Sequence, residues 1–200
     1  MAVPPRFFED GAYYHVYNRG NRKQQIFFSN RDYERFLEKI IEYKKKYPVE
    51  ILSYCLMPNH FHFLIQQLPA SSISKFMSDL CNSHSRYLNV KYEFVGSLFQ
   101  GRFKAKRVDT DEYLVHLSRY IHLNPVELLF KDKNIFERLT FYKWSSLSAY
   151  LSGKKNDIAN PQTILDYFLI KDKSGGYRNF LESNVLLEED PTISHLTFKD

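Results

Sequence analysis

The chain has 200 residues, 44% of them hydrophobic, with 28 basic and 23 acidic side chains and a formal net charge of +5. This length suits one domain, or one domain with an appendage, and it is enough to bury a sizeable core. No apolar run approaches the roughly 20 residues that cross a bilayer, and residues 1–20 lack the apolar stretch and cleavage site of a signal peptide, so we expect a cytoplasmic protein with no membrane partner.

The pattern of apolar, glycine and proline residues predicts seven elements in chain order: a strand at 13–20, a helix at 30–47, strands at 49–57 and 60–67, a helix at 71–92, an extended segment at 97–108 and a helix at 109–127. Pro58 and Asn59 turn the chain between the two adjacent strands, which predicts a hairpin. The order of elements predicts an α+β fold, in which one largely antiparallel sheet carries helices packed on one face.

The C-terminal quarter is less regular in pattern. Residues 152–162 have the composition of a linker, and short helices are expected over 162–184. We therefore predict one domain over residues 1–150 and a small helical extension over 151–200, with an acidic end that we expect to be disordered.

The charge is distributed unevenly along the chain. Residues 181–200 hold five acidic residues and one lysine, a net charge of −4, which leaves +9 on residues 1–180. A basic body suggests a polyanionic partner such as nucleic acid, although a solubilising surface gives the same balance.

Two histidines stand one residue apart in the predicted strand at 60–67, within the sequence MPNHFHFLI. Because alternate side chains of a strand share a face, His60 and His62 point the same way, and Phe61 and Phe63 point the other way. Two neutral imidazoles at this spacing can bind one divalent metal ion, but a third ligand must come from elsewhere. A pair of hydrogen-bonded or surface histidines is the alternative, which this short motif does not exclude.

The predicted helix at 109–127 offers that third ligand. Its residues His116, Tyr120 and Asn124 are spaced four apart and line one stripe. The amide oxygen of Asn124 suits Mg²⁺ or Mn²⁺, and the Tyr120 hydroxyl, one turn away, can attack a phosphate. Tyr113 is a competing nucleophile on much the same stripe, and an ordinary amphipathic tyrosine is the alternative for either residue. A metal site requires that the strand face carrying His60 and His62 lie opposite the Tyr120–Asn124 stripe, in the same chain or in a partner.

A basic and aromatic segment, FQGRFKAKR, covers residues 99–107. Alternation along an extended chain separates a basic face from an apolar one, which suits contact with DNA phosphates and stacking on bases. An edge strand protected by charges gives the same pattern. The candidate DNA-binding side chains are Arg102, Lys104, Lys106 and Arg107.

The motifs NRG, MPNHFHFLI, GSLFQGRFKAKRV, YLVHLSRYIHLNPV and WSSLSAYL follow one another in the chain. Together they resemble the single-tyrosine HUH transposases, and most closely the REP-associated, IS200-like branch, over about residues 11–185. The resemblance implies a ferredoxin-like fold with an antiparallel sheet. It also implies an enzyme that needs Mg²⁺ or Mn²⁺ and binds hairpin and single-stranded DNA.

By motif, the resemblance makes His60, His62 and Asn124 metal ligands and Tyr120 the nucleophile. The tyrosine of such enzymes attacks a DNA phosphate and forms a 5′-phosphotyrosine with a free 3′-hydroxyl. A second 3′-hydroxyl then resolves this intermediate without ATP. His116 matches no family motif, and we expect it to contact DNA or to support the site. Relatives include dimers with shared active sites and apparent monomers, so a homodimer and a monomer both remain open.

Two other functions fit parts of the sequence. A hairpin-binding module or domesticated regulator would keep the DNA surface, with catalysis lost or unused. A histidine-motif phosphoesterase would need two HxT or HxS elements, of which only HLT at 195–197 is present, and the His60–His62 pair does not match that motif.

Overall fold

The computed structural model describes residues 7–129, 134–170 and 176–183. The elements, in chain order, are β1 (Tyr13–Arg19), a 3-10 turn (Asn21–Lys23), α1 (Asn30–Lys46), β2 (Glu50–Met57), β3 (His60–Gln66), α2 (Ile73–Tyr92), β4 (Lys104–Val108), α3 (Asp111–Leu123), α4 (Val126–Leu129), α5 (Ile135–Thr140), α6 (Leu147–Ser152), α7 (Gln162–Ile170) and α8 (Gly176–Glu182). Within the described ranges, no helix has both the length and the apolar character needed to cross a membrane.

The four strands form one sheet in the order β2-β3-β1-β4. All three pairings are antiparallel, with β1 and β3 at the centre and β2 and β4 at the edges. The succession β1-α1-β2-β3-α2-β4 is that of a ferredoxin-like fold. The predicted α+β fold with an antiparallel sheet is therefore confirmed.

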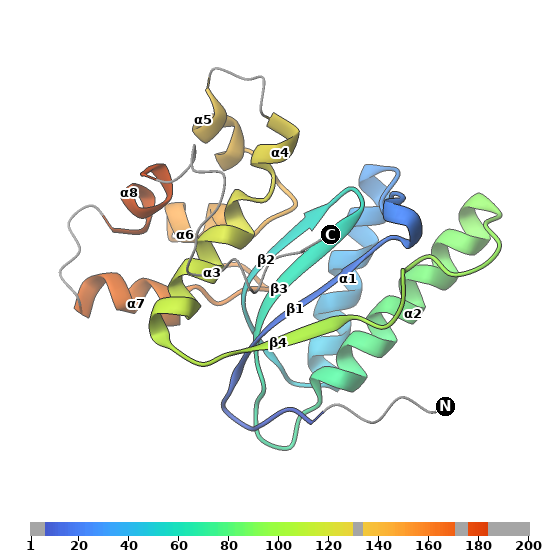
Figure 1. Cartoon of the computed structure of the whole chain (residues 1–200), viewed down its shortest axis with the longest axis horizontal. Helices are drawn as coiled ribbons and strands as arrows, with labels where there is room; N and C mark the ends of the chain where they lie inside the picture. Colours follow the sequence, from blue (N-terminus) through green and yellow to red (C-terminus); the bar gives the residue numbers. More distant parts are fainter. Residues whose placement is uncertain (1–6, 130–133, 171–175, 184–200) are drawn as a thin grey trace.

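The two faces of the sheet enter separate apolar layers. Val16 of β1 and Phe61 and Phe63 of β3 point into a core shared with α1 and α2. Cys55 of β2 and Leu64 of β3 point to the other side, where α3 and α6 to α8 supply the partners. Figure 1 shows α1 and α2 on one side of the sheet and α3 with the shorter C-terminal helices on the other. The predicted layer of helices on one face of the sheet corresponds to α1 and α2. The helices on the other face form a second layer.

The segment 144–146 ties the second layer to the edge strand β2. The Leu56 N–H donates to the Trp144 carbonyl (2.9 Å), and the Tyr54 N–H donates to Oγ of Ser146 (2.9 Å). The same Oγ lies 2.7 Å from Nε2 of His122, a fully buried residue of α3. Burial lowers the pKa of His122 to about 3, so the ring is neutral and shares a proton within this network. The network fixes the position of α3 against the sheet.

Helices α7 and α8 pack on α3. They contribute four side chains that are at most 5% exposed to the second layer: Ile164, Phe168, Tyr177 and Leu181. The Tyr177 hydroxyl lies 2.7 Å from Nδ1 of His122, on the opposite side of the ring from Ser146. The division of the chain at residue 150 stays a prediction, and the acidic segment after residue 183 lies outside the described residues.

Candidate active site

His60 and His62 lie on the face of the sheet that α3 covers. His60 is 8% exposed and His62 is fully buried. The centroids of their two rings are 5.0 Å apart, and the ring planes cross at 84°. Asn124 follows α3 directly, and its Oδ1 lies 3.1 Å from Nε2 of His60. The face of β3 that carries the two histidines therefore contacts the end of the Tyr120–Asn124 stripe within one chain.

The orientation of Asn124 is set by its own helix. Its Nδ2 donates to the Tyr120 carbonyl (2.8 Å), which turns Oδ1 toward His60. On the other side of the imidazole, Nδ1 of His60 lies 2.7 Å from Oδ1 of Asn59. Burial lowers the pKa of His60, so the neutral ring has one proton for two oxygens. A proton on Nδ1, facing the shorter contact, leaves the lone pair of Nε2 beside the Asn124 oxygen.

This donor set fits a divalent metal ion. If the ring proton of His60 is on Nδ1, the lone pairs of Nε2 and of Oδ1 of Asn124 face each other at 3.1 Å, and a cation that binds both atoms stabilises the pair. In an octahedral site with ligand distances of about 2.1 Å, neighbouring ligands are about 3 Å apart. Across the described parts of the chain, no three His, Cys, Asp or Glu side chains gather into a metal site. An ion here therefore needs the amide oxygen of Asn124 as its third protein ligand.

His62 has a second histidine as its neighbour. Nδ1 of His62 lies 2.8 Å from Nε2 of His15, and the two rings stack with centroids 5.0 Å apart. Burial, followed by the charges of His60 and His15, lowers the pKa of His62 well below its ordinary value. Either ring can donate in this hydrogen bond, and the tautomer of His62 follows from its direction: if Nδ1–H of His62 donates to His15, Nε2 of His62 carries the lone pair.

The Tyr120 ring packs nearly perpendicular to both neighbouring imidazoles. The ring centroids lie 5.4 Å from His62 and 6.1 Å from His15. Burial raises the pKa of the Tyr120 phenol to about 12, so the hydroxyl keeps its proton at neutral pH. A nucleophile in this position needs help to lose that proton.

Tyr17 is a second tyrosine beside the histidines, and its position there was not predicted from the sequence. Its ring stacks on His62 with centroids 5.8 Å apart, and it is the cross-strand partner of His62. Tyr113, the competing nucleophile on the same helix, stands eleven residues before Asn124, about 16 Å along α3. The structure therefore separates Tyr113 from the histidines and brings Tyr17 to them.

His116 lies one turn before Tyr120 on α3. Its Nδ1 lies 3.0 Å from a guanidinium nitrogen of Arg119, and its ring packs against Phe180 of α8. These contacts place the side chain at the junction of α3 with α8. Its expected contact with DNA stays a prediction.

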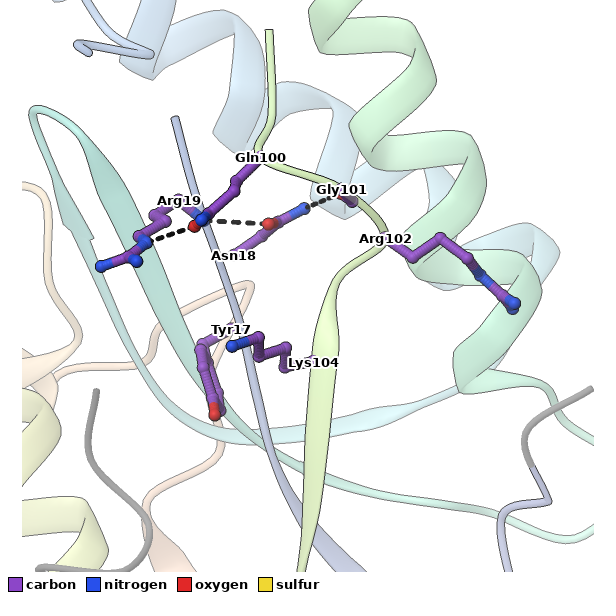
Figure 2. Close-up of a pocket in the computed structure, with 7 residues that line it drawn as sticks. All are labelled: Tyr17, Asn18, Arg19, Gln100, Gly101, Arg102 and Lys104. Carbon is purple, nitrogen blue, oxygen red and sulfur yellow. Dashed lines mark hydrogen bonds between the residues drawn. The ribbon is translucent and has the colours of Figure 1, made fainter. Parts of the chain in front are cut away.

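The four basic residues around β4 do not form one surface. Lys104 and Lys106 pair with Tyr17 and His15 in the sheet register, so they share the histidine face. Arg107 points to the opposite face, where it forms ion pairs with Glu9 and Asp109. The side chain of Arg102 turns away from Lys104, on the other side of β4 (Figure 2). As predicted, the apolar Phe103 alternates with Lys104 and enters the core of α1 and α2.

Three residues of β1 that were not predicted as site residues lie beside the two histidines: His15, Tyr17 and Arg19. Their alternation in YYHVYNRG puts them on one face of a strand. That signal was available in the sequence. The pairing of β1 with β3, which sets Tyr17 opposite His62 and Arg19 opposite His60, was not.

Comparison with known proteins gives three results. The family model described as "Transposase IS200 like" matches residues 9–124. A search of curated proteins finds no match. Among solved structures, a REP-associated tyrosine transposase bound to a REP hairpin is similar with a TM-score of 0.61 and 17% identity, over 80% of this chain and 92% of that one. A candidate transposase from Deinococcus radiodurans has a TM-score of 0.42 and 15% identity, over 60% of this chain and 95% of that one.

Proposed function

The chain belongs to the family of IS200-like transposases, and from this premise we propose that it cleaves and rejoins single-stranded DNA beside a hairpin, through a covalent bond to Tyr120. The observation that carries the proposal is the meeting of β3 with the end of α3. There the Nε2 of His60 lies 3.1 Å from Oδ1 of Asn124, and the Tyr120 ring packs on His62.

We assign His60, His62 and Asn124 as the ligands of one Mg²⁺ or Mn²⁺ ion. Two neutral imidazoles and an amide oxygen are acceptable ligands for either ion, and neither histidine has to lose a proton to bind it. When bound, such an ion polarises a phosphate oxygen and neutralises charge that develops during displacement.

His15 orients His62 in this scheme. If Nδ1–H of His62 donates to Nε2 of His15, the Nε2 of His62 keeps its lone pair for a metal ion. His15 is fully buried, and its ring contacts both Tyr17 and Tyr120, so it has little freedom to turn. We therefore treat His15 as a positioning residue.

Tyr120 is the proposed nucleophile. Its phenolic oxygen loses its proton to solvent and forms a bond to phosphorus while the bond from phosphorus to the 3′-oxygen breaks. The departing oxygen takes up a proton from solvent, which gives a 5′-phosphotyrosine and a free 3′-hydroxyl. Attack by a second 3′-hydroxyl reverses this exchange and releases Tyr120. One phosphoester bond forms for each that breaks, so the reaction needs no ATP.

The proposed DNA partner is a hairpin with a single-stranded flank. A solved structure of similar fold is bound to a REP hairpin, and Lys104 and Lys106 put positive charge on the histidine face of this sheet.

Incubation of the protein with Mn²⁺ and a labelled hairpin that carries single-stranded flanks tests the proposal. We expect a covalent protein–DNA adduct on a denaturing gel. Tyr120→Phe should abolish the adduct, and Tyr113→Phe, on the same helix but about 16 Å from Asn124, should preserve it. An adduct that persists in Tyr120→Phe would refute the assignment.

Hairpin binding without cleavage, in every divalent metal, would favour the alternative of a binding module or a domesticated regulator. The HLT run that a histidine-motif phosphoesterase would use lies outside the described residues. Deletion of residues 190–200 should abolish activity for such a phosphoesterase and should leave it intact for the enzyme proposed here.

A further inference from the structure

A pocket of about 250 Å³ opens where β1 ends and the chain enters β4. Seven residues line it, none of them acidic: Tyr17, Asn18, Arg19, Gln100, Gly101, Arg102 and Lys104. The Arg102 side chain turns away from the opening (Figure 2), so the positive charge at the pocket comes from Arg19 and Lys104. Figure 2 shows the Lys104 side chain reaching across β1 toward Tyr17, while Arg19 meets Gln100 on the other side of the opening. A pocket with this charge fits an anionic group.

The backbone around the pocket is held by its own hydrogen bonds. Nδ2 of Asn18 donates to the Gly101 carbonyl (3.1 Å), and the Gln100 N–H donates to the Arg19 carbonyl (3.0 Å). At Gly20 a Cβ would lie 2.0 Å from the Gln24 carbonyl oxygen, so only glycine lets the chain turn this closely. The shape of the pocket is therefore set without a ligand.

Arg19 is positioned for planar recognition. Its Nε donates to Oε1 of Gln100, which fixes the plane of the guanidinium. A fixed guanidinium suits the oxygens of a phosphate, and the exposed Lys104 adds a mobile point charge.

The sheet register places this pocket next to the candidate active site. Arg19 is the cross-strand partner of His60, and Tyr17 is the cross-strand partner of both His62 and Lys104. Adjacent strands are about 4.8 Å apart, so the cations lie one to two strands from the histidines on the same face. A DNA strand that crosses the sheet from the histidines toward β4 passes over the pocket.

We propose that the pocket binds a backbone phosphate of the unpaired nucleotide that adjoins the cleaved phosphodiester, with Arg19 and Lys104 as its cationic ligands. This inference rests on the proposed function for the identity of the strand. A phosphate bound in the pocket would fix the position of the single-stranded flank, so that the next phosphate lies beside the two histidines and Tyr120.

Fluorescence anisotropy with labelled twelve-nucleotide oligothymidylate, in EDTA and at several salt concentrations, tests the pocket without metal and without cleavage. Each phosphate contact on a single strand contributes about 0.7 to the slope of log affinity against log salt. We expect Lys104→Ala to lower the slope by about that amount. Arg107→Gln removes one charge from the opposite face of the same strand and should leave the slope unchanged.

Gly101 provides a test that keeps every charge. A Cβ at this position meets no atom within 4 Å, so a larger side chain can be accommodated in the fold. Gly101→Leu should weaken oligothymidylate binding about tenfold, the loss expected for one charge-assisted hydrogen bond, and Gly101→Ala should not. Thermal unfolding checks that each variant folds. If Gly101→Leu does not fold, the salt slope of Lys104→Ala alone tests the pocket.

The proposal is overturned if Lys104→Ala keeps the wild-type slope, or if Arg107→Gln lowers it equally. Neither Tyr120 nor a metal ion takes part in this assay. If Lys104→Ala keeps the wild-type slope while the wild-type protein forms the covalent adduct, the pocket assignment is wrong and the proposed enzyme stands. If Lys104→Ala lowers the slope but no adduct forms, the proposed enzyme is wrong and the pocket assignment stands.

Discussion

Nε2 of His60 lies 3.1 Å from Oδ1 of Asn124, although 64 positions separate the two residues in the chain. The contact joins the start of β3 to the end of α3 and brings the proposed metal ligands together. It depends on the amide of Asn124, which α3 itself orients through the Tyr120 carbonyl.

Replacement of Asn124 tests the third metal ligand. Asn124→Leu removes the oxygen beside His60 and should weaken Mn²⁺ binding about tenfold or more. Asn124→Asp retains an oxygen ligand and should bind Mn²⁺ at least as well as the wild type. Electron paramagnetic resonance of free Mn²⁺, without DNA, measures both. Equal affinities in Asn124→Leu and the wild type would exclude Asn124 as a ligand.

Replacement of His15 tests the orientation of His62. His15→Leu removes the acceptor for Nδ1–H of His62 and should weaken Mn²⁺ binding about 10- to 100-fold, whereas His15→Gln keeps an acceptor and should restore much of the affinity. Nitrogen NMR shifts of the metal-free protein report the tautomer directly. A mixture of His62 tautomers is expected in His15→Leu, and an unchanged tautomer there would exclude the positioning role.

Ser146 should carry stability and not DNA recognition. Ser146→Ala leaves the Tyr54 N–H and a nitrogen of buried His122 without their partner, at a cost of about 1–3 kcal/mol in the free energy of unfolding. Ser148→Ala, two residues away on the exposed side of α6, should change it by less than about 0.5 kcal/mol. Urea titration measures both, and a variant Ser146→Ala as stable as wild type would contradict the structural role of the segment.

Asp32 should make the fold sensitive to acid. Burial alone raises the pKa of its carboxyl, but hydrogen bonds from Lys91, the Phe28 backbone, Tyr92 and Tyr87 outweigh burial and hold the pKa below the usual 3.8. The pKa in the folded state is therefore lower than in the unfolded state. The carboxylate stabilises the protein above about pH 4, and this contribution is lost as the pH falls further.

Asp32→Asn should accordingly cost about 3 kcal/mol in the free energy of unfolding at pH 7, because it leaves the Lys91 ammonium and two phenols without a carboxylate. The difference from wild type should shrink below about pH 4. Asp79→Asn, on the more exposed pair with Lys46, should cost less than about 1 kcal/mol. A constant difference from pH 7 to pH 3 would contradict the assigned pKa direction.

Local rules predicted the strands, the long helices and the direction of the histidines. Alternation in HFHFLI separates His60 and His62 from Phe61 and Phe63, because a strand permits no other arrangement. The four-residue spacing of Tyr120 and Asn124 likewise follows from helix geometry. These relations extend over a few residues, and no tertiary contact is needed to fix them.

The remaining features depend on contacts between distant segments. That His15 meets His62 follows from the pairing of β1 with β3, which the sequence of β1 does not specify. The second helical layer needs the hydrogen bonds of Ser146 to β2 and α3, which its sequence motif gives no reason to expect. Arg107 was grouped with Lys104 by composition, but the register of β4 sends it to the opposite face.

Identification of the amino acid that carries the DNA tests the central claim most directly. The adduct formed with a flanked hairpin and Mn²⁺ is digested with protease and nuclease, and the modified peptide is sequenced by mass spectrometry. We predict a nucleotide on Tyr120, in the peptide that also contains Asn124. A nucleotide on Tyr17, the other tyrosine beside His62, or on Tyr113 would contradict the account.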